Sequence, residues 1–308
     1  MMQKKNITKT DEIYLRPGTV IVGKWNGNKY IIKRKIGAGM IGTVYLCQVN
    51  NQFVALKISK QAMSLTSEVN VLKSLNKVQD KRLGPFLLDV DDYEAKDGEK
   101  YSFYVMEYIR GTSLESFVRQ NGYEWIGVFL IQILEQLEEL HQAGWVFGDL
   151  KNDNLLVSSN PPQVHFIDVG GTTKIGRSIK EYSEFYDRAY WYLGSREAEP
   201  SYDLFALVMV VLTIFYPKQF KRTKHARQQI YQKIIAVKEL TPFRPIFMKA
   251  IDGKYDRAKE MKEELIQRLM KRKKGYDTSE NKKTHYIIEA LIITCISSIY
   301  FILSYFIG

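Results

Sequence analysis

The sequence predicts an α+β protein with a small, strand-rich first lobe, a larger helical second lobe and a single C-terminal transmembrane helix. Three observations predict this arrangement. Residues 29–59 alternate apolar runs with glycines, residues 110–274 contain several stretches with helical spacing, and residues 286–307 are almost free of charge. With 308 residues, 45% of them hydrophobic, the chain is long enough to bury a core in two lobes.

The first lobe is predicted from short runs of strand-forming residues. The stretches "KYIIKRKIGAGMIGTVYLCQV" and "QFVALKIS" are rich in Val, Ile, Tyr and Phe. They predict three antiparallel strands with a glycine-rich turn between the first two. In "SLTSEVNVLKSLNKV", leucine and valine recur at near-helical spacing, so a helix is expected after these strands. Residues 101–109, "YSFYVMEYI", are strand-like again and place the end of this lobe near residue 110.

The second lobe is predicted to be helical. The apolar face of "IGVFLIQILEQLEELHQAG" predicts a long helix that ends at Gly144. After Pro217 we expect two basic helical segments, at residues 218–239 and 254–274. The predicted division of the chain is an N-terminal extension at 1–27, the first lobe at 28–109, the second lobe at 110–274, a polar juxtamembrane linker at 275–285 and a transmembrane helix at 286–307.

The last 22 residues before Gly308 carry one charge, Glu289, near their start. A helix of this length covers the ~30 Å hydrocarbon core of a bilayer. Basic residues lie just upstream, at 271–274 and at Lys282 and Lys283, so the positive-inside rule predicts a single-pass protein of the cell membrane with both lobes in the cytoplasm. A buried core helix is the alternative, which such a long run with so little polar content disfavours.

The formal net charge of +11 is concentrated in one part of the chain. Residues 1–216 hold 25 Lys and Arg against 25 Asp and Glu, whereas residues 217–274 hold 18 against 6. This asymmetry predicts an anionic partner, nucleic acid or acidic lipid, with a solvated basic face as the alternative. Nearness to the membrane favours lipid for residues 271–283, while residues 218–238 suit either polyanion equally. The predicted contacts are Lys218, Lys221, Arg222, Lys224, Arg227, Lys271, Arg272, Lys273 and Lys274.

The stretch "GAGMIGTV" fits the pattern G-x-G-x-x-G-x-V between two predicted strands. Glycines at these positions let backbone N–H groups approach phosphate oxygens without a side chain in the way. A dinucleotide-binding fold would have a helix directly after the glycines, and here the strand "TVYLCQV" follows. The pattern therefore favours a phosphate-covering loop between strands.

A lysine and a glutamate follow the glycine-rich stretch. Lys57 ends "VALK" on an otherwise apolar strand, and Glu68 lies on the helix predicted next. A lone strand lysine is ordinarily a solvent-facing residue. After a glycine-rich loop, however, such a lysine can reach the phosphates of ATP, and a glutamate on the next helix can pair with it and fix its position.

The stretch "VFGDLKNDNLLV" fits the catalytic-loop pattern D-L-K-x-x-N. Asp149 would accept or orient the proton of an attacking hydroxyl, Lys151 would neutralise charge on a transferring phosphoryl group, and Asn154 would hold a metal ion. Further along, "VHFIDVGG" places Asp168 at the end of an apolar strand, where a carboxylate can bind Mg²⁺. Either aspartate alone could be a helix cap or a turn residue, but this order and spacing favour phosphoryl transfer.

With these motifs in this order, the chain resembles the Hanks-type, eukaryotic-like protein kinases over roughly residues 28–270, and among them the short bacterial serine/threonine kinases with a C-terminal membrane anchor. The resemblance implies a bilobal kinase fold with ATP in the cleft between the lobes, together with Mg²⁺ or Mn²⁺. It also implies a hinge after Met106, and an aspartate, Asp203, that ties the central helix of the second lobe to the catalytic loop. The residues implied to bind the nucleotide are Gly37, Ala38, Gly39, Gly42, Val44, Ala55, Lys57, Glu68, Glu107 and Tyr108.

The chain departs from the family pattern in three places. The family has His-Arg before the catalytic aspartate, where this chain has Phe147 and Gly148, and it has Asp-Phe-Gly where this chain has Val169 in the middle. Without that arginine a phosphorylated activation loop lacks its usual cationic partner, so we expect control by another route. The Ala-Pro-Glu signature is also missing, which leaves Glu197 and Glu199 as rival stand-ins.

Autophosphorylation is expected between Asp168 and Glu199, because this stretch is rich in hydroxyl groups. Ordinary loop polarity would produce the same composition. The predicted sites are Ser178, Ser183, Ser195 and Thr173.

These inferences predict a membrane-tethered serine/threonine kinase that transfers the γ-phosphoryl group of ATP to protein hydroxyls, with a homodimer as an open alternative for its assembly. Two rival functions remain. Small-molecule phosphotransferases share a Gly-Asp-x-x-x-x-Asn loop, which Gly148 fits, although Lys151 and the long hydroxyl-rich loop favour protein substrates. A pseudokinase scaffold would explain the altered motifs, but the retained phosphate and metal groups oppose it.

Overall fold

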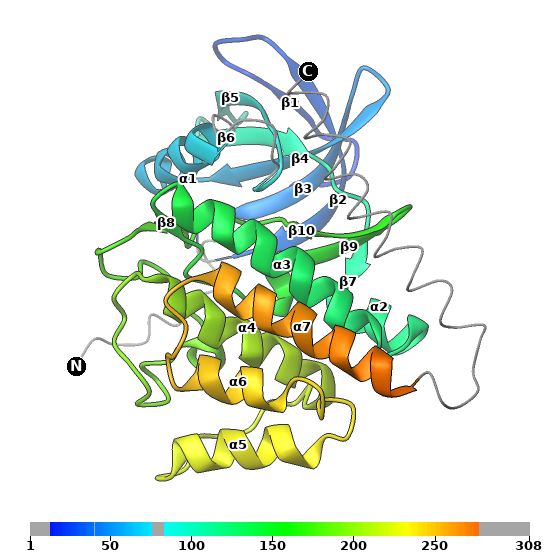
Figure 1. The fold of residues 1–308 in the computed structure, drawn as a ribbon. Helices are drawn as coiled ribbons and strands as arrows, with labels where there is room; N and C mark the ends of the chain where they lie inside the picture. Colours follow the sequence, from blue (N-terminus) through cyan, green and yellow to red (C-terminus); the bar gives the residue numbers. More distant parts are fainter. Residues whose placement is uncertain (1–12, 40, 76–82, 277–308) are drawn as a thin grey trace, which may run out of the picture. The chain divides into compact units, whose positions relative to one another are not determined.

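The computed structural model describes residues 13–39, 41–75 and 83–276, with side chains described up to Lys271. The chain divides into two units, residues 1–265 and 266–308, and both lobes belong to the first. Figure 1 shows the first lobe as a sheet with one helix, in blue and cyan, and the second lobe as a group of helices with short strands.

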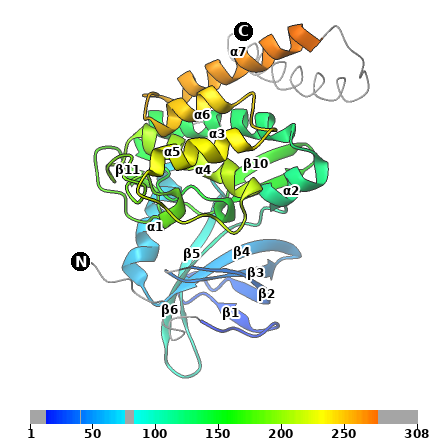
Figure 2. The same ribbon diagram turned by 90° about the horizontal axis from the view of Figure 1, so that it is seen from below.

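The first lobe is a six-stranded antiparallel sheet in the order β1-β2-β3-β4-β6-β5, with α1 packed on β5 and β6. Figure 2 shows this sheet clear of the helices of the second lobe. The predicted strands correspond to β2, β3, β4 and β6, and the predicted helix to α1. Strand β5 was not predicted, because its sequence "LLDVDDYE" has four acidic residues and aspartate and glutamate are depleted in strands. The bounds are β1 (Val20–Val22), β2 (Lys29–Ala38), β3 (Thr43–Val49), β4 (Gln52–Ser59), α1 (Ala62–Leu75), β5 (Leu87–Glu94) and β6 (Lys100–Glu107).

Alternating side chains on these strands build the core of the first lobe. On β2, Tyr30 and Ile32 are buried, whereas their neighbours in the strand face solvent. They pack with Leu56 of β4 and Phe103 of β6, both fully buried. Burial of each such apolar side chain contributes about 1.5–3 kcal/mol, so the period-two pattern fixes which face of the sheet meets α1 and which meets this core.

The second lobe is built around α4, which is buried on all sides from Tyr202 to Ile214. A helix that is apolar all round belongs in the centre of a domain. The predicted long helix is α3, which ends two residues before Gly144, where a φ of 84° suits glycine. The helices are α2 (Leu114–Asn121), α3 (Trp125–Gln142), α4 (Pro200–Phe215), α5 (Ala226–Ala236), α6 (Arg244–Ile251) and α7 (Ala258–Tyr276).

The two predicted basic helices are only partly correct. Residues 218–225 form a loop, because the inward-facing apolar residues of α5 begin at Ala226 and continue at Ile230 and Ile234. Helix α6 was not predicted. Helix α7 confirms most of the helix predicted at 254–274, although it begins at Ala258. Its first turn is tied to α3 by Glu138, which accepts a hydrogen bond from the Lys259 amide at 2.9 Å.

Five short strands of the second lobe bracket the catalytic loop. One sheet has the order β10-β9-β7, and a second pairs β8 with β11. Gln132 and Gln136 of α3 hydrogen-bond the backbone of β10 at Pro162 and Val164, so side-chain amides satisfy this strand edge. The bounds are β7 (Thr112–Ser113), β8 (Trp145–Val146), β9 (Leu155–Ser159), β10 (Pro162–Phe166) and β11 (Thr173–Lys174).

The predicted transmembrane helix at 286–307 lies outside the described residues. Among the residues that the structure does describe, no helix combines the length and the apolar character needed to cross a bilayer.

Candidate active site

The glycine-rich turn joins β2 and β3, with Gly37 opposite Val44 and Ala38 opposite Thr43. At Gly42 a β-carbon would lie 2.4 Å from the carbonyl oxygen of Ile58, so only glycine fits. At Gly39 a β-carbon would meet open space. Glycine is required at residue 42 by packing within the sheet, whereas the bare backbone at Gly39 allows a ligand to approach closely.

Lys57, Glu68 and Asp168 meet between the lobes. The Lys57 Nζ lies 2.9 Å from Glu68 Oε1, 2.7 Å from Glu68 Oε2 and 3.7 Å from Asp168 Oδ1. Burial alone would lower the pKa of Lys57, but Asp168 and Glu68 outweigh burial and raise it. The pKa of Glu68 is also raised, because burial outweighs the nearby ammonium group. The lysine is therefore a fixed positive charge that points toward Asp168.

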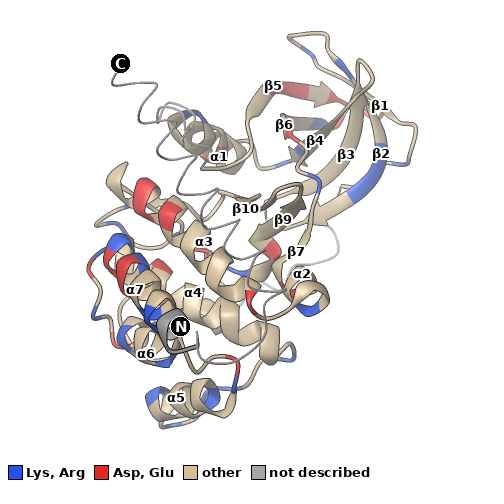
Figure 3. Ribbon diagram, turned by 45° about the vertical axis from the view of Figure 1, so that its right-hand side comes forward, with Lys and Arg blue, Asp and Glu red and all other residues tan. Residues whose placement is uncertain are grey.

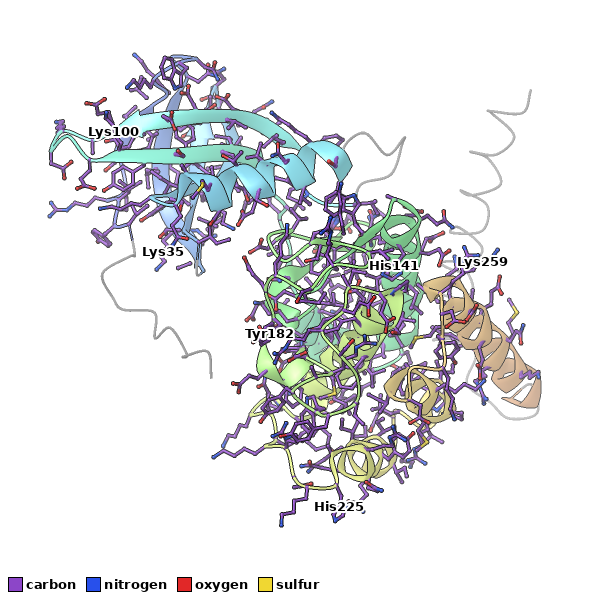
Figure 4. All side chains as sticks on the ribbon, turned by 90° about the vertical axis from the view of Figure 1, so that its left-hand side faces the viewer. Lys35, Lys100, His141, Tyr182, His225 and Lys259 are labelled. Carbon is purple, nitrogen blue, oxygen red and sulfur yellow. The ribbon has the colours of Figure 1, made fainter. Side chains whose placement is uncertain are left out.

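Asp203 of α4 holds the start of the catalytic loop. Its carboxylate accepts hydrogen bonds from the backbone N–H groups of Phe147 at 2.8 Å and Gly148 at 2.9 Å, and it lies 2.9 Å from His141 Nε2. Figure 4 labels His141 among the side chains of this lobe. The tie between the central helix and the catalytic loop that the family resemblance implied is thus present.

The backbone explains why the family's arginine is replaced. Gly148 has a φ of 81°, and a β-carbon there would lie 2.7 Å from the carbonyl oxygen of Gly171. In turn, a β-carbon on Gly171 would lie 2.8 Å from Cβ of Asp149. The chain segments before Asp149 and after Asp168 therefore touch through backbone, which leaves no room for a side chain at residue 148.

Asp149, Lys151 and Asn154 lie side by side, as predicted. Lys151 Nζ donates to Asp149 Oδ2 at 2.5 Å, and Asn154 Nδ2 donates to the Asp149 carbonyl at 2.8 Å. Sequence reasoning missed the next contact as a feature of the site: Ser183 Oγ donates to Asp149 Oδ1 at 3.0 Å and accepts from Lys151 at 3.3 Å. A hydroxyl group thus already occupies hydrogen-bonding positions on both charged side chains.

The predicted metal ligands are oxygen donors on adjoining segments. Asn154 uses its amide nitrogen in the bond to Asp149, which orients its carbonyl oxygen as the remaining acceptor. The carboxylate of Asp168 accepts from the amide of Gly170 at 2.9 Å and is 45% exposed. This donor set fits a hard divalent cation that keeps part of its water shell. In the described part of the chain, no group of three or more His, Cys, Asp and Glu side chains could hold a metal ion.

The segment from Asp187 to Glu199 is anchored by ion pairs. Arg188 lies 2.6 Å from Glu199, and Arg196 lies 2.8 Å from the fully buried Asp187. Tyr202 of α4 also donates to Asp187, at 3.0 Å. Glu197 and Glu199 were the two candidates for the glutamate of the missing Ala-Pro-Glu signature. Glu199 makes the anchoring ion pair, whereas Glu197 is exposed and pairs with Ser178 in an isolated backbone bridge.

At the predicted hinge, the N–H of Glu107 donates to the Phe86 carbonyl at 2.9 Å, so this donor is used within the first lobe.

The predicted phosphorylation sites differ in accessibility. Ser178 and Ser195 are exposed, whereas Thr173 is buried and donates to the Gly171 carbonyl at 2.8 Å.

The predicted basic contacts divide into two groups. Lys218, Lys221, Lys224 and Arg227 are exposed, on or near the loop before α5 that Figure 4 marks with His225 and on α5 itself. Arg222 instead packs between aromatic rings, 3.8 Å from the centroid of Tyr192 and 4.7 Å from that of Tyr190, and donates to the Tyr190 carbonyl. Figure 3 shows the charged residues along α5 and α7. In α7 Lys271 is exposed, and the side chains of Arg272, Lys273 and Lys274 lie outside those described.

Comparison with known proteins identifies the family. Residues 30–285 match the protein kinase domain family. The chain belongs to the protein kinase family. It is 47% identical over 274 residues to the serine/threonine-protein kinase YabT of Bacillus subtilis, an alignment that covers 88% of this chain and 81% of YabT. It is 31% identical over 175 residues to the serine/threonine-protein kinase PknG of Mycobacterium leprae, covering 52% of this chain and 22% of PknG.

The fold comparison agrees. The structure of vaccinia related kinase 3 superposes with a TM-score of 0.62 at 17% identity, covering 86% of this chain and 94% of that one, which supports the fold alone. The predicted bilobal kinase fold and serine/threonine kinase activity are thus confirmed, and the family implies ATP, a divalent metal and protein substrates.

Proposed function

We propose that this kinase transfers the γ-phosphoryl group of ATP to serine or threonine hydroxyls of proteins, with Asp149 as the catalytic base. The observation that supports this role best is the hydrogen bond from Ser183 Oγ to Asp149 Oδ1 at 3.0 Å, since a positioned base must reach the hydroxyl it deprotonates. An acceptor serine that displaces Ser183 would meet the same carboxylate and the same lysine.

The remaining residues have distinct roles in this proposal. Lys57 binds the ATP phosphates while Glu68 holds its ammonium group, and Lys151 offsets the negative charge on the transferring group. Asn154 and Asp168 would hold the divalent cation. That cation supplies charge neutralisation on the phosphates and a template for their alignment. The proton of the acceptor hydroxyl passes to a carboxylate oxygen of Asp149 as the new phosphate ester bond forms and ADP leaves.

The test is transfer of labelled γ-phosphate by the purified full-length chain, kept in detergent, to itself and to a generic protein acceptor. Lys57→Ala and Asp149→Asn serve as inactive controls. We expect label on serine or threonine that both substitutions abolish. Nucleotide binding without any transfer would support a pseudokinase instead, and label found only on small metabolites would support a small-molecule phosphotransferase.

Mapping the label by mass spectrometry tests autophosphorylation. Ser178 and Ser195 are the candidates that the structure exposes, and Ser183 is the one beside Asp149. Thr173 is buried, so it would have to leave its place before modification.

Membrane anchoring through residues 286–307 is also proposed, with the lobes on the cytoplasmic side. The uncharged run and its upstream basic residues support it. Cell fractionation tests it: the full chain should remain in the membrane pellet after alkaline washing, and a chain truncated after residue 283 should not.

We infer further that a polyanion binds the exposed lysines before α5 and the basic residues at 271–274. The assay above should be repeated with DNA and with vesicles of anionic lipid. Substitution of Lys218, Lys221 and Lys224 by glutamate should weaken binding to whichever polyanion stimulates transfer, and equal stimulation of the substituted chain would contradict this assignment.

A further inference from the structure

Strand β6 places a tyrosine hydroxyl against the pair formed by Lys57 and Glu68. Tyr104 lies directly opposite Lys57 in the register of β4 and β6, so both side chains leave the same face of the sheet, toward α1. The Tyr104 hydroxyl donates to Glu68 Oε2 at 2.9 Å. Tyr104 is 2% exposed and Glu68 is 2% exposed, so water does not compete for this bond.

The hydrogen bond matters because Glu68 is a buried carboxylate with one cationic partner. Lys57 lies within 2.9 Å of both carboxylate oxygens. A carboxylate held by the ammonium group alone can turn about its last bond, whereas a second donor fixed in the sheet restricts that rotation. The apolar residues of α1 that face the sheet, such as Leu65 and Val69, set the position of the helix but do not direct the carboxylate.

We propose that Tyr104 is a positioning residue, which orients Glu68 and through it the Lys57 ammonium group for ATP. This inference rests on the proposed role of Lys57 in binding the ATP phosphates. Tyr104 touches neither ATP nor the acceptor. Its effect passes through the Glu68 carboxylate. The hydrogen bond also holds α1 against β6 in the position where Glu68 reaches Lys57, and it needs no phosphate on the chain between Asp168 and Glu199.

Tyr104→Phe tests the proposal, since it removes only the hydroxyl group. Tyr45→Phe is the matched control: Tyr45 is as buried, in the same sheet, and its hydroxyl bonds the backbone of Ile13 and Leu15 away from the site. Loss of the hydrogen-bond partner that orients a metal-binding side chain typically costs about 10-fold or more in affinity or activity, and we take this as the scale for the partner of Glu68. We expect Tyr104→Phe to raise the KM for ATP about 10-fold with an unchanged KM for the protein substrate, and Tyr45→Phe to change neither KM.

The KM comparison separates positioning from general loss of structure. A variant that is only less stable contains less folded enzyme, so its apparent kcat falls while both KM values stay unchanged. Thermal unfolding of both variants measures that loss directly. A Tyr104→Phe chain with the ATP KM of the parent would overturn the proposal.

A binding measurement completes the test and does not depend on phosphoryl transfer. The affinity of the full chain for a fluorescent ATP analogue is measured for Tyr104→Phe, for Glu68→Ala and for the double variant. Because Tyr104 acts through Glu68, its substitution should weaken binding in the parent and have no further effect in Glu68→Ala. Independent, additive losses would overturn the proposal. A parent chain that binds the analogue but transfers no phosphate would refute the proposed function instead, and the Tyr104 comparison would still stand.

Discussion

Substitution of Gly148 by alanine tests why this kinase lacks the arginine that its family has before the catalytic aspartate. Gly148 has a φ of 81°, and a β-carbon there would lie 2.7 Å from the Gly171 carbonyl oxygen. The left-handed conformation alone costs alanine about 1–2 kcal/mol. Forcing an extra carbon into a packed position adds about 1–3 kcal/mol. Gly148→Ala should therefore destabilise the protein by about 2–5 kcal/mol, the sum of these two terms.

Gly144→Ala is the control that separates the two contributions. Gly144 has a φ of 84°, but a β-carbon there meets nothing within 4 Å. It should cost only the conformational strain, about 1–2 kcal/mol. Chemical denaturation of both variants measures the difference, and 1 kcal/mol corresponds to about 2–4 °C in Tm for a domain of this size.

Activity gives a second measurement on the same pair of variants. Because Gly171 also lies against Asp149, a displaced Gly171 carbonyl should move the base, and kcat should fall about 100-fold in Gly148→Ala. Gly144→Ala should retain its kcat. Equal destabilisation of both variants with intact kcat would show that the contact with Gly171 does not exclude a side chain at residue 148, and this explanation of the missing arginine would then be wrong.

The remaining predictions concern other contacts of the second lobe. Ser183→Ala should lower the KM for a protein substrate about 5-fold, because an acceptor hydroxyl no longer has to displace a hydrogen bond of about 1 kcal/mol between Ser183 and Asp149, whereas Ser183→Thr, which keeps the hydroxyl, should leave this KM unchanged in steady-state assays. Arg188→Ala should lower the free energy of unfolding by about 1–3 kcal/mol at neutral pH, because the Ser195 carbonyl and the Ser201 hydroxyl lose their donor, whereas Glu199→Gln should cost less in denaturation experiments because its carboxylate is 46% exposed and solvent weakens the ion pair. Glu138→Gln should lower stability at pH 7 but not at low pH: although burial acts to raise the pKa of Glu138, its bonds to the Lys259 amide and Arg257 lower it overall, so the stabilisation is present above the usual glutamate pKa and is lost as the pH falls through the lowered value. Denaturation of parent and variant across acidic pH checks this, and a pH-independent difference would contradict it.

Motif spacing predicted which residues the catalytic loop brings together, because the kinase fold fixes their order along the chain. Asp149, Lys151 and Asn154 are close in sequence, so the local loop alone brings them together. The pair of Lys57 with Glu68 was also predictable, since a strand and the helix after it present both side chains to one cleft.

Contacts across long sequence separations were not predictable in the same way. The hydroxyl of Ser183 reaches Asp149 across 34 residues, and Tyr104 reaches Glu68 across 36. Neither residue belongs to a motif, and each is one of many hydroxyl groups in its stretch. Register in the sheet and the path of the activation segment select them, and both are set by tertiary packing.

The absence of the family's arginine at residue 148 and the ion pairs of residues 187–199 are related, because both concern how the activation segment, residues 168–199, is held without a phosphate. A phosphorylated segment needs a cation near the catalytic loop, and backbone contact between Gly148 and Gly171 removes the position from which the family supplies it. In its place, the segment carries its own opposite charges: the fully buried Asp187 pairs with the partly exposed Arg196, and Arg188 lies against Glu199. These pairs need no phosphate to form. The segment that brings Ser183 to Asp149 is thus held in place by residues that the unmodified chain already contains, and a phosphate added there would have to compete with carboxylates for the same two arginines.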